Sequence, residues 1–399
     1  MQPRADNSQR YLPQDGFAGT LIGRVWVPSS ASQPIAGPSP AWIHAEGVFD
    51  LAPVAPTCAE LLNRGFASSA TNRSTLKRLG SYDEIMANTM VPASQRNDRL
   101  PYFLSPVDLQ AIKACGVTFV VSLLERVIEE RAAGDLRKAD AIRQTITARI
   151  GADLASVKPG SAKAEELKAA LKAEGLWSQY LEVGIGPYAE VFTKAQPLSS
   201  VGTGADVGIL SVSSWNNPEP ETVLLVDAKA KVVGATLGND VNLRDIEGRS
   251  ALLLGKAKDN NAACAIGPFI RLFDETFNLN DVRHQDVGLT IVGEDGFQLS
   301  EVSRMRKISR DLLELVAQTI NENHQYPDGI ALFTGTLFAP TQDRGGQGKG
   351  FTHKLGDIVR ISSEKLGTLQ NRVNHCHQAP PWEFGISALM RNLHQRRLL

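Results

Sequence analysis

The sequence predicts a β-rich α+β fold with a smaller α+β domain at the N-terminal end. From about residue 187 to 373, short apolar segments alternate with turns that contain Gly, Pro and Asn, and helical patterns interrupt them only near 241–254 and 308–323. Two charged segments of helical character precede this region, at 124–149 and 162–174. Many short strands with few helices favour a sandwich or roll over alternating βαβ units.

Length and composition indicate a folded protein of one large domain or two domains. The chain has 399 residues, 42% of them hydrophobic, and a formal net charge of −1. Near neutrality gives no reason to expect nucleic acid as a partner. No apolar run is long enough to span a membrane, and the first residues lack the apolar core of a signal peptide. The four cysteines have no Cys-x-x-Cys spacing, which is typical of reduced thiols, so we expect a cytoplasmic protein.

The predicted N-terminal domain covers residues 1–105. Its β-branched and aromatic content predicts a strand at 19–27, and 41–51 is expected to form a pair of strands. Thr57 is a suitable cap for a short helix that extends to residue 64. Residues 66–100 are expected to be irregular.

The predicted second domain covers residues 106–399. A short helix at 106–115 is expected to lead into an apolar strand at 116–122. The charged segment at 124–149 is the longest predicted helix, and Gly134-Asp135 can divide it in two. For both charged helices, a solvated face is a commoner explanation than a binding surface.

Three carboxylates form the strongest candidate for a functional site. Glu219 and Glu221 are two residues apart, so in a strand their side chains point to the same face, and Asp240 follows Glu221 by 19 residues. Carboxylates on one face repel each other unless a cation lies between them, and hard divalent ions such as Mg²⁺ or Mn²⁺ prefer oxygen ligands. Any one of these acids is more often a surface residue. The set is harder to explain in that way, because Glu221 leads into one apolar strand segment and Asp240 follows another.

Three other features carry weaker signals. Lys258 follows an apolar segment, although a lysine in such a place is more often solvated than catalytic. Residues 374–377, Asn-His-Cys-His, lack the spacing of a zinc motif, and we interpret them as structural. The glycine-rich segment 345–350 lacks the strand–helix context and the Ser/Thr of a phosphate-binding loop, so we expect a flexible loop.

Motifs spread over residues 106–375 resemble the fumarylacetoacetate hydrolase superfamily. They are Phe-Thr-Lys at 192–194, Glu-Pro-Glu at 219–221, Asn-Asp-Val-Asn-Leu-Arg-Asp at 239–245, Thr-Gly-Thr at 334–336, and the strand-like segments 355–359 and 367–371. The resemblance implies a mixed β-sandwich roll and a homodimer or homotetramer. It also implies a Mg²⁺ site, with Mn²⁺ as an alternative, at Glu219, Glu221 and Asp240. The substrate-contacting residues that it implies are Arg244, Lys258, Gly335 and Thr336, of which Lys258 is the active-site lysine.

The chain departs from the hydrolases of this superfamily at the residues that handle water. Where they carry His-x-x-Glu, this chain has Ser122 and Glu125, and Glu247 stands where many members have Gln. The family's His activates water, whereas an uncharged Ser is a poor base. These departures disfavour C–C bond hydrolysis. They make Ser122, Glu125, Glu247 and Lys258 the candidate catalytic residues, with Glu125 as the first choice for proton transfer.

Further segments resemble the sugar-acid dehydratases of the superfamily, namely 125–130, 176–187, 214–221, 255–262 and 324–329. This resemblance implies a lyase that converts 2-keto-3-deoxy-D-pentonate, the xylonate or arabinonate derivative, to α-ketoglutaric semialdehyde and water in oxidative pentose degradation. The implied route depends on Mg²⁺ and passes through an enolate that the metal stabilises. Two alternatives stay open. One is an acylpyruvate or diketo-acid C–C hydrolase with the same metal site, and the other is a metal-binding protein without catalysis.

Overall fold

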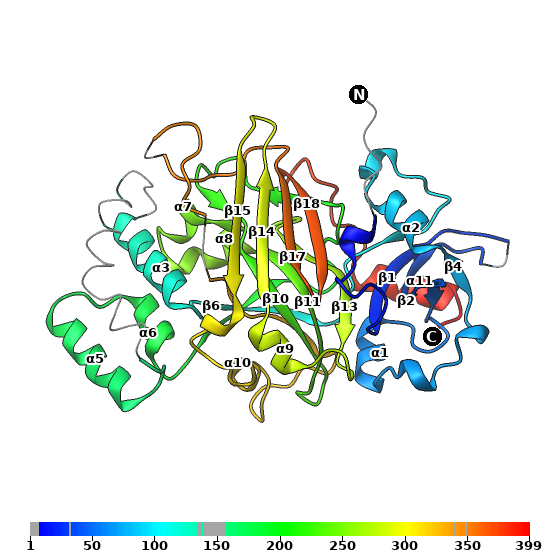
Figure 1. Ribbon diagram of the computed structural model, residues 1–399, viewed down its shortest axis with the longest axis horizontal. Helices are drawn as coiled ribbons and strands as arrows, with labels where there is room; N and C mark the ends of the chain where they lie inside the picture. The colour runs from blue at the N-terminus through cyan, green and yellow to red at the C-terminus, as the bar shows by residue number, and fades with distance from the viewer. Residues whose placement is uncertain are drawn as a thin grey trace.

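Two β-sheets pack against each other at the centre of the molecule, and helices lie at both ends (Figure 1). The structure is a computed structural model that describes residues 8–31, 33–133, 138, 142, 157–337, 340–347 and 349–399. Among these residues, no helix combines the length and the apolar character needed to cross a membrane. The expected break at Gly134-Asp135 lies outside the described residues.

The larger sheet has eleven strands and extends through most of the molecule. Its main path, in spatial order, consists of β4 (Arg78–Gly80), β3 (Gly47–Asp50), β2 (Gly37–His44), β1 (Leu21–Val27), β13 (Cys264–Leu272), β11 (Val232–Asp240), β10 (Pro220–Val226), β16 (Ile330–Phe333), β6 (Ala111–Gly116) and β7 (Glu190–Ala195). A further strand, β5 (Tyr102–Phe103), pairs with β1. Because β16 and β6 are parallel while the other pairs are antiparallel, the sheet is mixed.

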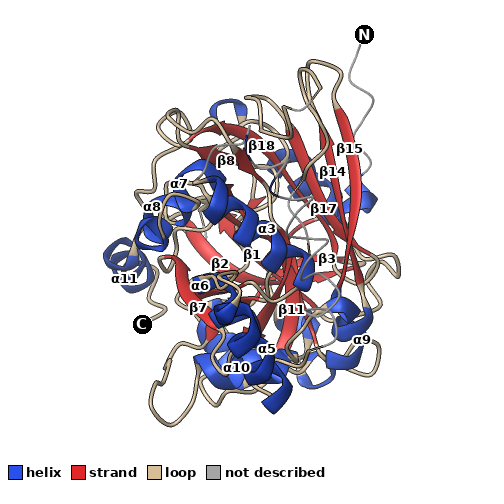
Figure 2. Cartoon of the chain, turned by 90° about the vertical axis from the view of Figure 1, so that its left-hand side faces the viewer, coloured by secondary structure: helices blue, strands red, loops and turns tan. Residues whose placement is uncertain are grey.

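The second sheet forms a separate layer, which is seen from the side in Figure 2. Its order is β15 (Gln298–Arg304), β14 (Asp286–Val292), β17 (Ile358–Ser363), β18 (Gly367–His375) and β8 (Asp206–Ile209). A short pair, β9 (Asn216–Asn217) and β12 (Asn242–Leu243), lies apart from both sheets. Two packed sheets, with helices that are mostly short, confirm the predicted β-rich α+β class.

Helices gather at the two ends of the molecule and at the sheet edges (Figure 1). The described helices are α1 (Cys58–Arg64), α2 (Tyr82–Thr89), α3 (Val120–Ala132), α5 (Ala162–Ala173), α6 (Gln179–Ile185), α7 (Arg244–Glu247), α8 (Leu254–Lys258), α9 (Leu279–His284), α10 (Leu312–Thr319) and α11 (Ile386–Gln395). One end carries α3, α5 and α6, and the other carries α1, α2 and α11.

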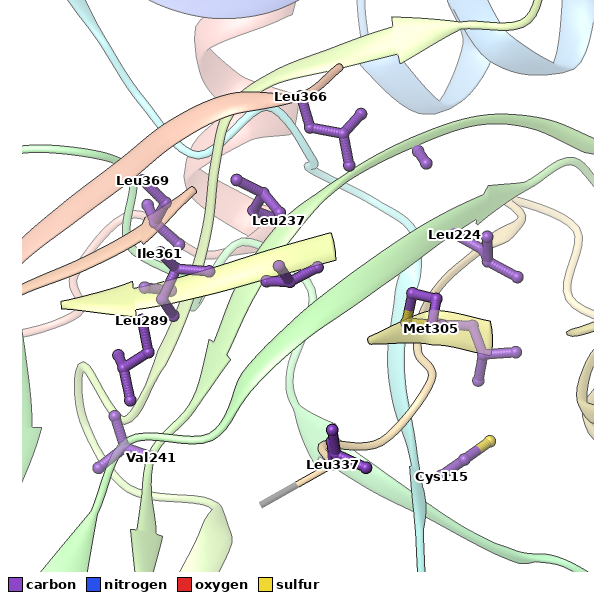
Figure 3. Close-up of a cluster of buried hydrophobic side chains, with 14 of the residues drawn as sticks. Cys115, Leu224, Leu237, Val241, Leu289, Met305, Leu337, Ile361, Leu366 and Leu369 are labelled. Atoms are coloured by element: carbon purple, nitrogen blue, oxygen red, sulfur yellow. The ribbon is translucent and has the colours of Figure 1, made fainter. Parts of the chain in front are cut away.

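The main hydrophobic core fills the space between the two sheets (Figure 3). Leu224 of β10 and Leu237 of β11 enter it from the larger sheet, and Leu289, Ile361 and Leu369 enter it from the second. Alternate side chains of a strand point to opposite faces of its sheet. In the apolar run at 223–226, Leu224 and Val226 therefore enter the main core, and Val223 and Leu225 enter a second core on the far face of the larger sheet. The central strand is therefore apolar on both faces, as is typical of a fully covered sheet.

Several predicted elements of the N-terminal part are confirmed. The strand at 19–27 is β1, and the pair at 41–51 is the hairpin of β2 and β3. Thr57 caps α1, because its side-chain oxygen accepts a hydrogen bond from the backbone N–H of Glu60. The prediction of irregular structure at 66–100 is wrong where Ser81 and Glu84 form a capping box that starts α2.

The prediction of a helix at 106–115 followed by a strand at 116–122 is wrong. Residues 111–116 form β6, and α3 begins at Val120. A short apolar run has no periodicity that separates a buried strand from a buried helix, and here the parallel pairing with β16 decides the outcome. The chain turns between the two elements at Val117, whose φ of 58° lies in the left-handed region. The later helix predicted at 162–174 is confirmed as α5.

Candidate active site

The carboxylate cluster is built by the hairpin of β10 and β11. Pro220 pairs with Asn239, so Glu219 lies opposite Asp240, whose backbone N–H donates a hydrogen bond of 3.1 Å to the Glu219 carbonyl. Glu221 follows two residues later on the same side of β10. The three buried side chains each offer a carboxylate oxygen, and these oxygens lie within 4.8 Å of one another. In the part of the chain that the structure describes, no other group of three or more His, Cys, Asp or Glu side chains is gathered in this way.

Amide groups fix the two glutamates of this cluster. Asn239 Oδ1 accepts a hydrogen bond from the Glu219 backbone N–H, and Asn242 Nδ2 donates one to Glu219 Oε1. Glu221 Oε2 accepts a hydrogen bond of 2.6 Å from the backbone N–H of Gly335. Gly335 has a φ of 92°, and a Cβ there would lie 1.9 Å from Thr118 Oγ1, so the turn requires glycine.

Two buried lysines approach the cluster. Lys258, at the end of α8, lies 2.5 Å from Glu219 Oε2 and 3.0 Å from Asp240 Oδ2. Lys194 on β7 forms an ion pair with Asp240, in which Nζ lies 2.7 Å from Oδ1 without the alignment of a hydrogen bond. It also donates a hydrogen bond of 2.6 Å to the backbone carbonyl of Lys258. Lys194 thus connects a candidate metal ligand to the backbone that carries Lys258.

Arg126 on α3 reaches the cluster from across the pocket. Its Nη2 donates a hydrogen bond of 2.6 Å to Glu219 Oε1, and its Nη1 donates to Glu247 at 2.6 Å and to Glu129 at 2.7 Å. Burial alone would lower the pKa of Arg126, but the charges of Glu129, Glu247 and Glu219 raise it. Sequence reasoning did not single out Arg126, because its place in the pocket depends on the phase of α3.

Glu190 is a second residue that sequence reasoning missed. It lies on β7 two and four residues before Phe192 and Lys194, so all three point to one face of the strand. Its carboxylate covers Gly116, where a Cβ would lie 2.1 Å from Glu190 Oε2. Among the described residues none forms a hydrogen bond or ion pair with this carboxylate. Burial, followed by the charge of Glu247, raises the pKa of Glu190 to about 7.

The electrostatics of the cluster are those of a cation site. Burial raises the pKa of Glu221, and the charges of Asp240 and Glu219 raise it further. Burial also acts to raise the pKa of Asp240, but Lys194 and Lys258 lower it. Burial acts to lower the pKa of Lys258, but the charges of Asp240 and Glu219 outweigh it and raise the pKa. This lysine is therefore held in its charged form.

The charge balance and the donor atoms fit a divalent metal. Three cations reach the pocket, namely Arg126, Lys194 and Lys258. Five carboxylates line it, namely Glu190, Glu219, Glu221, Asp240 and Glu247. When all of these groups are ionised, the pocket has two negative charges in excess. A divalent ion would balance that excess. Hard oxygen donors are the ligands that Mg²⁺ prefers, so the residues fit the ion.

The pocket brings together most of the residues predicted from the sequence. Of these, it is lined by Ser122, Glu219, Glu221, Asp240, Glu247, Lys258, Gly335 and Thr336. The volume of this pocket that is open to the centre of a water molecule is only about 20 Å³. The side chains therefore nearly close the pocket, since one water already needs a large part of such a volume.

Glu125 and Arg244 lie behind this lining. Arg244 is buried, lies 3.0 Å from Glu125 and 2.5 Å from Glu129, and stacks on the ring of Trp215 at 4.3 Å. Two side-chain sets thus leave α3 in different directions. Ser122 and Arg126 face the pocket, while Glu125 and Glu129 face Arg244.

The remaining sequence motifs lie outside the pocket lining. The rings of His375 and His377 stack with centroids 5.4 Å apart, and Cys376 is a free thiol. The glycine-rich segment follows Arg344, a buried residue that forms ion pairs with Asp357 and Asp295. In their described residues, neither segment contributes a side chain to the pocket lining.

Comparison with known proteins relates the chain to one enzyme family. Residues 218–374 match the family described as fumarylacetoacetate (FAA) hydrolase, C-terminal. The matched region contains the three clustered carboxylates and Lys258. The chain therefore carries a domain of the fumarylacetoacetate hydrolase family.

Two of the relatives that match are named as dehydratases. The 2-dehydro-3-deoxy-D-arabinonate dehydratase of Saccharolobus solfataricus is 35% identical over 180 residues, which cover 45% of this chain and 57% of that enzyme. The probable 2-keto-3-deoxyxylonate dehydratase of Haloferax volcanii is 28% identical over 266 residues, which cover 61% of this chain and 88% of that protein. Dehydratases are hydro-lyases, so these relatives support an enzyme of the lyase type.

Solved structures show the same fold. A 2-keto-3-deoxy-D-arabinonate dehydratase complexed with magnesium and 2,5-dioxopentanoate has a TM-score of 0.59 at 23% identity, covering 89% of this chain and 99% of that chain. A fumarylacetoacetate hydrolase from Exiguobacterium antarcticum has a TM-score of 0.53 at 16% identity, with the same coverage of both chains. At these identities the likeness shows the fold, and both a dehydratase and a hydrolase share it.

Proposed function

We propose that this protein is a Mg²⁺-dependent hydro-lyase that converts 2-keto-3-deoxy-D-pentonate to α-ketoglutaric semialdehyde, which is 2,5-dioxopentanoate, and water. The observation that carries the proposal is a buried Glu219, Glu221 and Asp240 cluster beside Lys258 and Glu190, in a pocket whose described lining contains no histidine. Such a pocket offers groups for charge stabilisation and proton transfer, but its described lining lacks the histidine that activates water in the hydrolases which the chain resembles.

The names of the relatives support the substrate class. The Saccharolobus and Haloferax proteins are named for dehydration of the 2-keto-3-deoxy derivatives of arabinonate and xylonate. With a ketone at C2 and no hydroxyl at C3, both D-pentonates keep C4 as their one stereocentre and give the same compound. The structural neighbour that holds magnesium also holds 2,5-dioxopentanoate, the product proposed here. We propose Mg²⁺ as the ion of this chain, with Mn²⁺ as an alternative, because both prefer oxygen ligands.

Glu219, Glu221 and Asp240 would hold the metal. When bound, Mg²⁺ would act as a Lewis acid toward the 2-keto acid group and so make the C3 hydrogens more acidic. Asp240 and Glu219 raise the pKa of Lys258 in the metal-free protein, and as an ammonium group it would donate a hydrogen bond to developing negative charge. The Gly335–Thr336 turn lies beside Glu221, where it would orient the carboxylate of the substrate.

Glu190 is the group best suited to move protons. Its pKa of about 7 allows it to take a proton from C3 and to give one to the hydroxyl that leaves C4. Elimination removes one hydrogen from C3 and the hydroxyl from C4. Loss of a C5 proton with protonation at C3 then gives an enol across C4 and C5. The enol loses its hydroxyl proton as C4 is protonated and so becomes the aldehyde, and one water is lost in total. Glu190 replaces Glu125 in this role because it lines the pocket, whereas Glu125 pairs with Arg244.

Ser122 and the closed pocket favour elimination over hydrolysis. Ser122 Oγ donates a hydrogen bond of 2.9 Å to the Phe119 carbonyl, which fixes the hydroxyl against its own helix. It would not deprotonate water near neutral pH. The alternative function, cleavage of acylpyruvates or related diketo acids, would use the same metal ligands, but no residue of the pocket lining favours it.

The decisive experiment compares the two reactions in one protein preparation. The purified protein with Mg²⁺ is incubated with 2-keto-3-deoxy-D-pentonate, the compound that both D-xylonate and D-arabinonate give, and, separately, with an acylpyruvate. Semialdehyde is measured with an aldehyde reagent, and pyruvate with lactate dehydrogenase. We expect semialdehyde from a pentonate and no comparable release of pyruvate. Faster cleavage of the acylpyruvate would overturn the proposal in favour of the hydrolase.

We further propose a cytoplasmic homodimer or homotetramer. The family resemblance supports the assembly, and the four free cysteines support a reducing compartment. Sedimentation velocity of the purified protein would give its mass in solution. A monomer over the concentration range of the activity assay would contradict the assembly.

A further inference from the structure

Both oxygens of one candidate metal ligand are already occupied by cations of the protein itself. Glu219 Oε1 accepts from Arg126 at 2.6 Å, and Glu219 Oε2 accepts from Lys258 at 2.5 Å. Asn242 adds a third donor on Oε1. An ionised carboxylate has about four lone-pair positions, so Arg126 and Asn242 fill those of Oε1, while Oε2 keeps one beside Lys258. A divalent ion that binds Glu219 therefore lies next to two charged donors that compete with it, and Oε1 becomes available to the ion when Arg126 leaves.

Arg126 is the donor that can leave at the lower cost. Its Nη1 also binds Glu129 and Glu247, at 2.7 and 2.6 Å, so its charge stays compensated after Nη2 lets go of Glu219. Lys258, in contrast, donates only to Glu219 and Asp240 among the described residues, and both of these are candidate metal ligands. A buried cation without a partner is strongly disfavoured, which makes Lys258 the poorer leaving group.

The small volume of the pocket also indicates that the Arg126 side chain has to move. A space of about 20 Å³ for the centre of a water molecule cannot admit a five-carbon acid together with a metal ion. Arg126 enters the pocket from α3, opposite the strand ends that carry Glu219, Glu221 and Asp240. A side chain that swings away from Glu219 therefore opens space beside the cluster.

We propose that Arg126 is a built-in counter-ion of the metal site, which occupies Glu219 in the metal-free protein and releases it when a divalent cation binds. Arg126 keeps Glu129 and Glu247 as partners after this change. Its freed Nη2 then becomes a donor in the pocket for an oxygen of the anionic substrate. Metal binding therefore precedes substrate binding. The inference rests on the divalent-cation site of the proposed function, but not on the dehydration reaction.

Calorimetric titration without substrate tests the inference. MgCl₂ is titrated into metal-stripped wild type, Arg126→Gln and Arg271→Gln at near-neutral pH. Arg271 is a matched control, because it is a fully buried arginine that pairs with Asp15, far from the carboxylate cluster. We expect Arg126→Gln to bind Mg²⁺ at least about tenfold more tightly than wild type, since a competing positive charge is removed, and Arg271→Gln to bind as wild type does. A purely structural role for Arg126 would weaken binding instead.

Each outcome decides between the inference and the function on which it rests. Equal or weaker Mg²⁺ affinity of Arg126→Gln, with normal binding by wild type, would overturn the inference and leave the proposed function standing. Wild type that binds no divalent ion would overturn both. If Arg126→Gln does not fold, crystal structures of wild type with and without Mg²⁺ decide: a hydrogen bond from Arg126 to Glu219 that persists in the Mg²⁺ complex would overturn the inference.

Discussion

At the scale of single residues, the partners of a side chain decide its role more than its chemical type does. Glu219 and Glu221 are the same residue two positions apart, yet Glu219 is bound by Arg126 and Lys258, while Glu221 accepts only from a backbone N–H among the hydrogen bonds of the described residues. The pKa of Glu221 is raised by burial and by its acidic neighbours. Of the three ligands, Glu221 therefore has the most to gain from a cation.

Glu221→Gln should abolish metal-dependent activity while leaving the fold intact. A neutral amide binds a hard cation less tightly than a carboxylate, and it can still accept the hydrogen bond from Gly335. We expect Mg²⁺ affinity to fall by roughly 100-fold or more, with little change in the urea midpoint of the metal-free protein. Full activity of this variant at limiting Mg²⁺ would show that the ion binds elsewhere.

A pair of glutamate variants separates proton transfer from support. Glu190→Gln should reduce kcat by roughly 100-fold to 10,000-fold with little change in the affinity for a 2-keto acid, because general acid–base groups contribute about that factor. Glu125→Gln should act through Arg244, and we expect a smaller loss of kcat, roughly tenfold or less. Steady-state kinetics with the same pentonate measure both. A larger loss in Glu125→Gln than in Glu190→Gln would restore Glu125 as the proton-transfer group.

The raised pKa of Glu190 also predicts a pH dependence of stability. Its pKa rises from 4.5 to about 7 on folding, so the stability that its protonated form contributes is present below about 4.5 and is lost as the pH rises through 7. Metal-free Glu190→Gln should therefore match wild type at about pH 4 and gain up to about 3 kcal/mol over it at about pH 8. Urea unfolding of both proteins at the two pH values gives the difference. A difference that does not change with pH would mean that Glu190 titrates normally.

At the scale of single elements, the sequence could predict the parts of the site that depend on strand alternation. Glu219 and Glu221 share a face because they are two apart, and their chain neighbours show that the strand is buried. The same alternation places Glu190 with Phe192 and Lys194, so that signal was available for Glu190 as well. Residues that share one face of a single strand can therefore be identified from the sequence, without knowledge of the fold.

The helix-borne part of the site could not be predicted in this way. Placing the start of the helix at 124 leaves Ser122 in a strand and gives no phase for the residues that follow. With α3 starting at Val120, residues four apart share a face, which joins Ser122 to Arg126 and Glu125 to Glu129. The turn at Val117 fixes where α3 starts. The strand before this turn, β6, is placed by its pairing with β16, which is distant in the sequence.

Glu129 holds α3 against the site, and its removal should loosen this helix. Its carboxylate binds Arg126 at 2.7 Å and Arg244 at 2.5 Å, and only 2% of its side chain is exposed. Glu129→Gln leaves two buried arginines short of a partner, so we expect a loss of about 3 kcal/mol and a faster amide exchange in α3 by roughly 100-fold. Glu166→Gln, on the exposed face of α5, is the matched control. Unchanged exchange in residues 120–132 would show that α3 is held by its apolar face alone.

At the scale of the whole molecule, the sequence predicted the class of fold but not how its parts join. Periodicity and turn residues predicted many short strands with few helices, and the structure confirms this class. They could not predict that β1 would pair with β13, because those strands are more than 200 residues apart in the chain. Through this pairing, the strands of the N-terminal part continue the sheet that carries the metal ligands.

The C-terminal helix strengthens the same junction. Arg396, just after α11, donates to the Pro38 carbonyl and to Ser39 Oγ, and Asn392 donates to the Ala36 carbonyl. Leu389 and Leu393 of α11 are buried in a small cluster with Leu198. The C-terminal helix is thus held against β2 and the residue that precedes it.

These contacts predict that a chain beginning at residue 106 will not fold as wild type does, although the predicted domain boundary lies there. The core on the far face of the larger sheet contains Val223, Leu225 and Phe333 from the second part, and it is covered from the first part by Ile22, Trp42, Phe49, Leu51, Leu61 and Leu62. Losing a buried side chain of this size costs about 1.5–3 kcal/mol, so six of them outweigh the net stability of a typical domain. The truncation would also expose β13 as a long apolar edge strand, which favours aggregation. We expect an insoluble product, or a soluble one without near-UV circular dichroism and without Mg²⁺ binding. A soluble truncated protein that unfolds cooperatively and binds Mg²⁺ with wild-type affinity would show that residues 106–399 are an independent domain.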